Sequence, residues 1–272
     1  VTVLTPISMD HREYLGENIC DIAREKAAIM RRGVSCVVSL QQPEVREVIK
    51  EVAAGLGSTC FFQEEHWSYW KEDKYFHLDN GYRKDRFRLP NLLGEHQIQN
   101  AAQAITCLDT SRVHNFKTEE INEGLRKVEW SGRLQRLRHG PIFEFLPSEW
   151  EIWLDGGHNI GSAEVLMGQF SKWQDKPLCG IFGMLGQKEP EAIIHKIGGY
   201  FDFVSTVSIQ NSSNTYSAID LSGFFNQKGV PSKPVDSIKD GIKEIVRASN
   251  IPSRIIIMGS LSLVGAILEE HG

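Results

Sequence analysis

Strand-like and helix-like segments alternate along most of the 272-residue chain, and this alternation restricts the fold more than any other feature. Residues 1–7 are expected to form a strand, 17–30 a helix and 35–40 a second strand. Residues 43–56 then form a helix that begins with proline. Because parallel strands need long crossover connections, usually helices, the pattern predicts an α/β fold with parallel sheets.

The alternation is interrupted between residues 59 and 88, where short aromatic-rich strands are separated by turns such as Asn80-Gly81. We expect an antiparallel appendage there, followed by helices over 95–108 and 118–127. Residues 130–147 contain glycines and prolines typical of a passage between domains. The alternation then resumes, with strands expected over residues 151–154, 178–182, 203–207 and 254–258.

Length and composition predict two globular domains, residues 1–130 and 131–272. A hydrophobic content of 41% is enough to form buried cores. The net charge of −5 argues against a nucleic-acid or anionic-membrane partner. No apolar run approaches the roughly 18 residues of a membrane span. Five cysteines without CxxC spacing are typical of reduced thiols in a cytoplasmic protein.

Unusual polar residues follow four of the expected strands, which is where ligands bind in open parallel sheets. These positions are Asp10-His11, residues 155–159, residues 183–188 and Gly259-Ser260. A single Asp-Gly after a strand is ordinarily only a turn. Several such loops at the same edges of two sheets favour a ligand site.

Lys26 occupies an unexpected place in the first helix. Ile22 and Met30 lie four residues to either side, so helical periodicity places the lysine within the apolar stripe. Its stem can carry the ammonium group to solvent or to a carboxylate. Alternatively, burial lowers its pKa and makes it a reactive neutral amine. Carbon dioxide would convert that amine into a carbamate, an anion that suits a hard divalent metal.

The helix expected over residues 95–108 has an apolar side and a polar side. His96, Asn100 and Gln103 lie together on the polar side. A hydrated surface is the simpler interpretation of this side. In the functional alternative, the amide of Asn100 pairs its donor and its acceptor with the edge of adenine.

Six segments, in order along the chain, resemble signatures of the folylpolyglutamate/dihydrofolate synthases, which belong to the Mur ligase superfamily. Residues 10–16 with 22–29 are similar to the family's DHxxYLG and IAxEKAGI, and residues 94–102 to its GxHQxxNAA. Residues 130–134 are similar to WPGRLE, and 155–159 to DGAHN. Residues 183–185 and 259–261 match two further family segments.

The resemblance implies the remainder of a P-loop ATPase-like domain of the Mur-ligase central type over residues 1–130, and a Rossmann-like glutamate-ligase domain over 131–272. It implies a ligase that uses ATP to join L-glutamate to dihydropteroate or to tetrahydrofolate polyglutamates through an acyl phosphate. The implied cofactors are ATP and Mg²⁺, with a monovalent cation as a further candidate. A cytoplasmic monomer that binds small molecules only is expected.

The same resemblance assigns roles to individual residues. His11 would be a metal ligand, and Lys26, as a carbamate, would help to hold the metal and so take part in catalysis. The second catalytic residue would be His158, beside the nucleotide and the reacting groups. ATP binding is implied for Asn100, Arg133, Asp155 and His158, and glutamate binding for Ser260 and Lys188.

The chain departs from the family pattern in several places. The family's Gly-Lys-Ser/Thr phosphate loop precedes the matched segments, and the 272 residues contain none. We therefore expect an upstream part to have been removed before Val1, and the chain by itself to be inactive. Gly157 and Ile160 replace the family's alanine and proline. Gln187 and Glu189 replace aspartates around Lys188, which weakens its assignment.

Three other interpretations stay open. A Mur-type peptidoglycan ligase would share the carbamylated lysine and the reaction, although His96-Gln97 and the Tyr14-Leu15-Gly16 segment favour the folate branch. A non-catalytic nucleotide-binding remnant would explain the missing phosphate loop. A purely structural α/β module would not need Lys26 on an apolar face.

Overall fold

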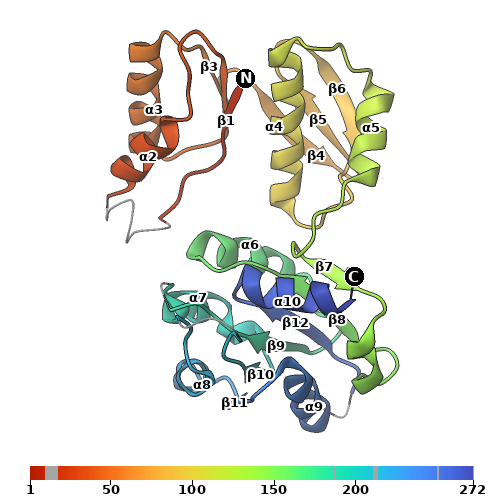
Figure 1. Ribbon diagram of the computed structural model, residues 1–272. Coiled ribbons are helices and arrows are strands. Elements are labelled where there is room, and N and C mark those ends of the chain that lie inside the picture. The colour runs from red at the N-terminus through yellow and green to blue at the C-terminus, as the bar shows by residue number, and fades with distance from the viewer. Residues whose placement is uncertain (10–17, 187, 211–213, 250, 272) are drawn as a thin grey trace. The chain divides into compact units, whose positions relative to one another are not determined.

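The computed structural model describes residues 1–9, 18–186, 188–210, 214–249 and 251–271. The chain divides into two compact units, residues 1–129 and 130–272. Each unit combines helices with a parallel sheet, which confirms the α/β class (Figure 1). Among the described residues, no helix combines the length and the apolar run that crossing a bilayer requires.

A three-stranded parallel sheet, in the order β1-β2-β3, organises the start of the first unit. Side chains of β2 alternate between its faces: Cys36 and Val38 pack with α2 and α3, whereas Val37 packs with α4. The elements are β1 (Thr2–Leu4), α2 (Ile19–Ala27), β2 (Cys36–Val38), α3 (Pro43–Leu56), β3 (Cys60–Phe62) and α4 (Glu95–Ser111).

The antiparallel appendage expected over residues 59–88 begins later, because residues 60–62 form β3 of the parallel sheet. The appendage itself is a three-stranded antiparallel sheet, β4-β5-β6. Phe76, Leu78 and Phe87 project from one face of this sheet into a core shared with α4 and α5. Figure 1 shows the two helices beside this sheet. The elements are β4 (Ser68–Glu72), β5 (Tyr75–Asp79), β6 (Lys84–Arg88) and α5 (Thr118–Lys127).

The second unit is built on a six-stranded sheet in the order β11-β10-β9-β12-β8-β7. Five strands are parallel, and only β7 runs antiparallel, beside β8. Helices α6, α7 and α8 contribute to one core and α9 and α10 to another, so the sheet is covered on both faces. The strands are β7 (Gln135–Leu137), β8 (Glu151–Asp155), β9 (Leu178–Phe182), β10 (Phe203–Thr206), β11 (Ser232–Pro234) and β12 (Arg254–Met258). The helices are η1 (Pro141–Phe145), α6 (Ile160–Phe170), α7 (Pro190–Ile197), η2 (Gly198–Tyr200), α8 (Ala218–Gln227), α9 (Ile238–Ala248) and α10 (Leu261–His271).

The segment 130–147, expected to be a passage between domains, belongs to the second unit. It supplies the edge strand β7, which was not expected, and the short helix η1, and Leu137 and Ile142 from it are buried in the core.

The edge strand β11 was also not expected. Its sequence Ser-Lys-Pro has no apolar alternation, and proline is tolerated because the strand lies at the edge of the sheet.

Candidate active site

The candidate site is built on strand ends that the sheet of the second unit places side by side. Asp155, Met258 and Phe182 are paired in register at the carboxyl ends of β8, β12 and β9. Each strand is followed directly by one of the polar or glycine-containing loops singled out in the sequence. The parallel register therefore brings three of the four expected loops to one edge.

Asp155 is held by backbone groups from two different segments. Its side chain is 6% exposed, Oδ1 accepts from the Gly157 N–H at 2.7 Å, and Oδ2 accepts from the Leu134 N–H at 2.9 Å. Burial raises the pKa of this carboxyl, while the two hydrogen bonds and the charges of Arg133 and His158 act in the opposite direction. The carboxylate thus fixes residue 134 and the loop after β8 to each other.

Arg133 lies within the segment that Asp155 holds. The Gly132 carbonyl accepts from the Gly156 N–H at 2.8 Å, so hydrogen bonds fix the backbone on both sides of the half-buried Arg133. A β-carbon at Gly132 would approach Val264 to 2.7 Å, and one at Gly156 would approach Leu261 to 2.3 Å. The segment is therefore packed against α10 as well as against the end of β8.

His158 is half-buried, and its ring is oriented by the main chain. Nδ1 lies 2.9 Å from the Gly156 carbonyl, which can only accept, so Nδ1 carries the hydrogen. In the neutral ring, Nε2 is then the acceptor. Asn159 follows as the N-cap of α6 and accepts from the Ser162 N–H at 2.8 Å.

Ser260 lies in the loop between β12 and α10 and is 3% exposed. Its Oγ accepts from the Ser262 N–H at 3.1 Å, as an N-cap does. Gly259 has φ +105°, and a β-carbon there would approach the Gly183 carbonyl to 2.5 Å. Only glycine allows this close approach of the loops after β12 and β9.

Lys188 lies in the loop between β9 and α7. It is half-buried, and its carbonyl accepts from the Tyr216 hydroxyl at 3.1 Å.

The prediction that Lys26 lies on a buried face is wrong. The lysine is exposed in the last turn of α2, while Ile22 and Ala23 are fully buried. At the end of a helix the long aliphatic stem can direct the ammonium group to solvent, even where the backbone position falls within the apolar stripe. His11, the expected metal ligand, lies outside the described residues.

The polar side expected for α4 is divided in the structure. Asn100 is exposed, and its amide donates to Gln97 Oε1 at 3.1 Å. Gln103 is only 2% exposed and donates to the carbonyls of Leu4 and Val37 at 2.9 and 3.3 Å. A hydrated polar face was therefore the wrong interpretation for Gln103, because strand carbonyls at this point provide its acceptors.

No protein-family model matches the chain. It is 30% identical over 295 residues to the dihydrofolate synthase/folylpolyglutamate synthase of Bacillus subtilis, covering 99% of this chain and 62% of that protein. It is 27% identical over 284 residues to the folylpolyglutamate synthase of Lacticaseibacillus casei, covering 99% of this chain and 61% of the relative. The chain is related to the folylpolyglutamate/dihydrofolate synthases. It spans about 61% of the length of these curated relatives.

Solved structures of folate synthases share the fold. Escherichia coli FolC in complex with DHPP and ADP matches with a TM-score of 0.84 at 22% identity, over 98% of this chain and 60% of that one. Mycobacterium tuberculosis folylpolyglutamate synthase complexed with ADP matches with a TM-score of 0.83 at 25% identity, over 98% and 62%. The expected fold, that of this ligase family, is therefore confirmed.

Two glutamines that follow strands of the first unit were not among the predicted site residues, although both connect neighbouring loops. Gln41 accepts from the Ile7 N–H at 3.0 Å and donates to the Thr5 carbonyl at 2.9 Å. Gln63 accepts from the Leu40 N–H at 3.0 Å and from Gln99, on α4, at 3.1 Å. The rule that polar residues after strands deserve attention would have found Gln41 and Gln63, since both lie within three residues of a strand end.

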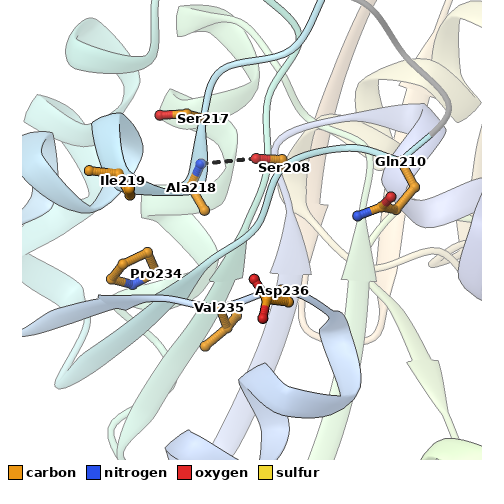
Figure 2. A pocket seen from close by; sticks show the side chains of 8 residues that line it. All are labelled: Ser208, Gln210, Ser217, Ala218, Ile219, Pro234, Val235 and Asp236. Carbon is orange, nitrogen blue, oxygen red and sulfur yellow. Dashed lines mark hydrogen bonds between the residues drawn. The ribbon is translucent and has the colours of Figure 1, made fainter.

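A cavity of about 440 Å³ lies at the carboxyl edge of the six-stranded sheet in the second unit, beyond β10 and β11 (Figure 2). Its lining comes from Ser208 and Gln210, the start of α8 and residues 234–236. The chain continues from β10 into α8 and from β11 into α9. Helix α8 packs in one core of the sheet and α9 in the other, so the two connections lead to opposite faces of the sheet. None of the described residues assigned from the folate-synthase resemblance lines this cavity.

Proposed function

We propose that the chain is the larger part of an ATP-dependent ligase that joins L-glutamate to dihydropteroate, to tetrahydrofolate polyglutamates, or to both. The proposal rests above all on one observation: Asp155 and Gly156 fix the Arg133 segment beside His158 at the carboxyl edge of a parallel sheet. The relationship to enzymes named for this activity supports it. The free cysteines support a reducing, cytoplasmic location, and a monomer is proposed.

The reaction needs an activated carboxylate, because the oxide of a free carboxylate is a poor leaving group. Transfer of the ATP γ-phosphoryl group to the substrate carboxylate forms an acyl phosphate and ADP. The glutamate amine then attacks the acyl carbon, the C–O bond to phosphate breaks, and the amine loses a proton. A positively charged side chain near the phosphates stabilises the charge that builds up during transfer.

Each residue at the described edge has a role in this proposal. Arg133 offsets phosphate charge, and Asp155 either contacts the ribose directly or positions Arg133 for the phosphates. His158 presents Nε2 towards the nucleotide, with Nδ1 engaged by Gly156. Ser260 and Lys188 bind the incoming glutamate, and Asn100 on α4 binds adenine.

Magnesium is proposed as the metal, and when bound it would neutralise charge on the transferring phosphoryl group. Over the described ranges, which omit residues 10–17, no group of three or more His, Cys, Asp or Glu side chains could hold it. The proposed ligands are His11 and the carbamate of Lys26. Lys26 is exposed, so carbon dioxide can reach its side chain and would react there with the deprotonated amine.

Nucleotide binding tests the role of Arg133. Isothermal titration of the chain with ADP should show binding, and Arg133→Ala should weaken it roughly tenfold or more, as loss of a charged hydrogen bond does. Arg138→Ala is the matched control, since Arg138 is an exposed arginine of the same segment. No ADP binding by the unsubstituted chain, or an equal loss in both variants, would contradict the proposal.

The Mur-type alternative differs in the amino acid that it adds. With the full-length product of the gene, ATP-dependent incorporation of L-glutamate into dihydropteroate or tetrahydrofolate is expected. Incorporation of another amino acid into a peptidoglycan precursor, with none into folate, would establish the alternative instead.

A further inference from the structure

Two thiols lie side by side at the amino-terminal edge of the parallel sheet in the first unit. Cys36 begins β2, Cys60 begins β3, and the parallel register pairs the two residues directly. Both side chains belong to the core formed with α2 and α3, so they project from the same face. Neighbouring strands lie about 4.8 Å apart, within the Cα separation of about 4.4–6.8 Å found in disulfides.

The two thiols differ in accessibility and in acidity. Cys36 is fully buried, whereas Cys60 is half-buried. A hydrogen bond from Cys60 lowers the pKa of Cys36 to about 7, and the same contact raises the pKa of Cys60. By contrast, burial raises the pKa of Cys107 and of Cys179 to about 12, which keeps these thiols protonated at neutral pH. One proton is thus shared by an adjacent pair of sulfur atoms.

We propose that Cys36 and Cys60 form a redox-active dithiol, which low-molecular-weight disulfides such as oxidised glutathione convert into a cross-strand disulfide. In the first step the proton of the accessible Cys60 passes to the Cys36 thiolate, and the Cys60 thiolate so formed attacks one glutathione sulfur. The S–S bond of glutathione breaks and releases one glutathione thiolate, which takes the proton from Cys36. The Cys36 thiolate then attacks Cys60 Sγ, and the mixed disulfide breaks to release the second glutathione. The two protein sulfur atoms are oxidised to a disulfide and one glutathione disulfide is reduced; the two released glutathione thiolates take up the shared proton and one proton from solvent.

The location separates this dithiol from the proposed ligase chemistry. The pair lies where β2 and β3 begin, whereas the residues proposed for ligand binding follow strand ends or lie on α2 and α4. The bridge would close a loop that contains the whole of α3, and closing such a loop restricts the unfolded chain. The oxidised chain should therefore melt at a higher temperature than the reduced chain.

Mass spectrometry of the intact 272-residue chain tests the proposal. After incubation with oxidised glutathione near neutral pH, the mass should fall by about 2 Da, and dithiothreitol should restore it. Peptide mapping without reduction should find Cys36 linked to Cys60. Cys60→Ser should abolish the loss of mass, while Cys20→Ser, a matched change at another half-buried cysteine, should leave it intact.

Several outcomes would overturn the proposal. These are an unchanged mass, a stable glutathione adduct in place of the loss, or a link that involves Cys20 or Cys107. If Cys60→Ser fails to fold, the peptide map of the unsubstituted chain decides the question by itself. Failure here would leave the ligase proposal untouched, because that proposal is tested by nucleotide binding and glutamate incorporation.

Discussion

The two ends of strand β8 each carry a buried carboxylate, but the two groups are stabilised in opposite ways. Glu151, at the start, is surrounded by side chains: Oε1 contacts Lys176 and Arg136 at 3.2 and 3.3 Å, and Oε2 accepts from Trp153 and Arg254 at 3.1 and 2.9 Å. Asp155, at the end, accepts from main-chain N–H groups of Leu134 and Gly157. Cationic side chains therefore neutralise the Glu151 carboxylate, whereas the Asp155 carboxylate holds two main-chain segments together.

The acidities follow from this difference. Burial by itself would raise the pKa of Glu151, but hydrogen bonds from Trp153, Arg254 and Lys176 outweigh it and lower the pKa to about 2. For Asp155, burial dominates and raises the pKa. A cation whose partners are all protein groups stabilises the fold, whereas a cation beside a carboxylate already held by the main chain remains able to attract a ligand. The comparison therefore favours a structural role for Arg254 and supports the proposal that Arg133 binds a ligand.

Removal of Arg254, the cation beside Glu151, should lower the stability of the fold most. Arg254→Ala leaves Glu151 buried without its closest cation and should lower the free energy of unfolding by about 3–5 kcal/mol in urea titrations. Arg247→Ala is the matched control, because the Arg247 side chain is 72% exposed and pairs only at the surface with Glu244; it should change stability by less than about 0.5 kcal/mol. Equal effects of the two substitutions would remove the distinction between the ends.

Acid should weaken the start of β8 selectively. The pKa of Glu151 falls on folding from 4.5 to about 2, so its contribution is complete above pH 4.5 and is lost as the pH falls towards 2. The expected loss is about 3 kcal/mol. Asp155 acts in the opposite sense: its raised pKa favours the protonated form, so its contribution declines as the pH rises above 3.8. Urea unfolding against pH should show a smaller acid loss in Glu151→Gln than in the unsubstituted chain, because the other carboxylates with lowered pKa values, such as Asp175 and Glu244, remain in both. An identical pH profile for both would contradict the assignment.

Substitution of Asp155 should have an intermediate effect. Asp155→Ala leaves the N–H groups of Leu134 and Gly157 without their acceptor, and the expected loss is about 1–3 kcal/mol. Amide hydrogen exchange at these two residues should accelerate. Asp202→Ala is the control, since Asp202 also accepts a main-chain N–H, that of Leu178, but is exposed. Unchanged exchange at residue 134 would show that Asp155 does not hold the Arg133 segment.

Arg133→Ala should have the smallest effect on stability, below about 0.5 kcal/mol, because Arg133 is only half-buried and the main chain already holds Asp155. The same variant is expected to weaken ADP binding. Parallel urea and calorimetric titrations measure both quantities. A stability loss like that of Arg254→Ala would mean that Arg133 is structural.

Local signals made much of the fold predictable. Helix α3 was expected over the residues that form it, because Pro43 lies in its first turn and Gly57 ends it with φ +60°. Edge strands β7 and β11 were not, because three-residue strands at a sheet edge owe their existence to the neighbouring strand. The exposure of Lys26 and the burial of Gln103 also depend on tertiary surroundings that a helical period does not contain.

The site was predictable as a set of loops but not as a geometry. Parallel strands bring their carboxyl ends together, so residues 155–159 and Ser260 were expected at one edge. The hydrogen bond between Asp155 and Leu134 spans 21 residues and joins the end of β8 to the residue before the edge strand β7, so no local pattern contains it. The role of each side chain in the reaction is still a prediction.

The contact between His158 and the Gly156 carbonyl gives the imidazole ring a direction. A carbonyl oxygen requires a hydrogen on Nδ1 whether the ring is neutral or charged, so gain or loss of a proton can alter only Nε2. A ligand facing Nε2 would meet a lone pair in one state and a hydrogen in the other, while the opposite side of the ring stays the same. Proton transfer at this position can therefore reverse the preference for donor or acceptor ligands without moving the backbone.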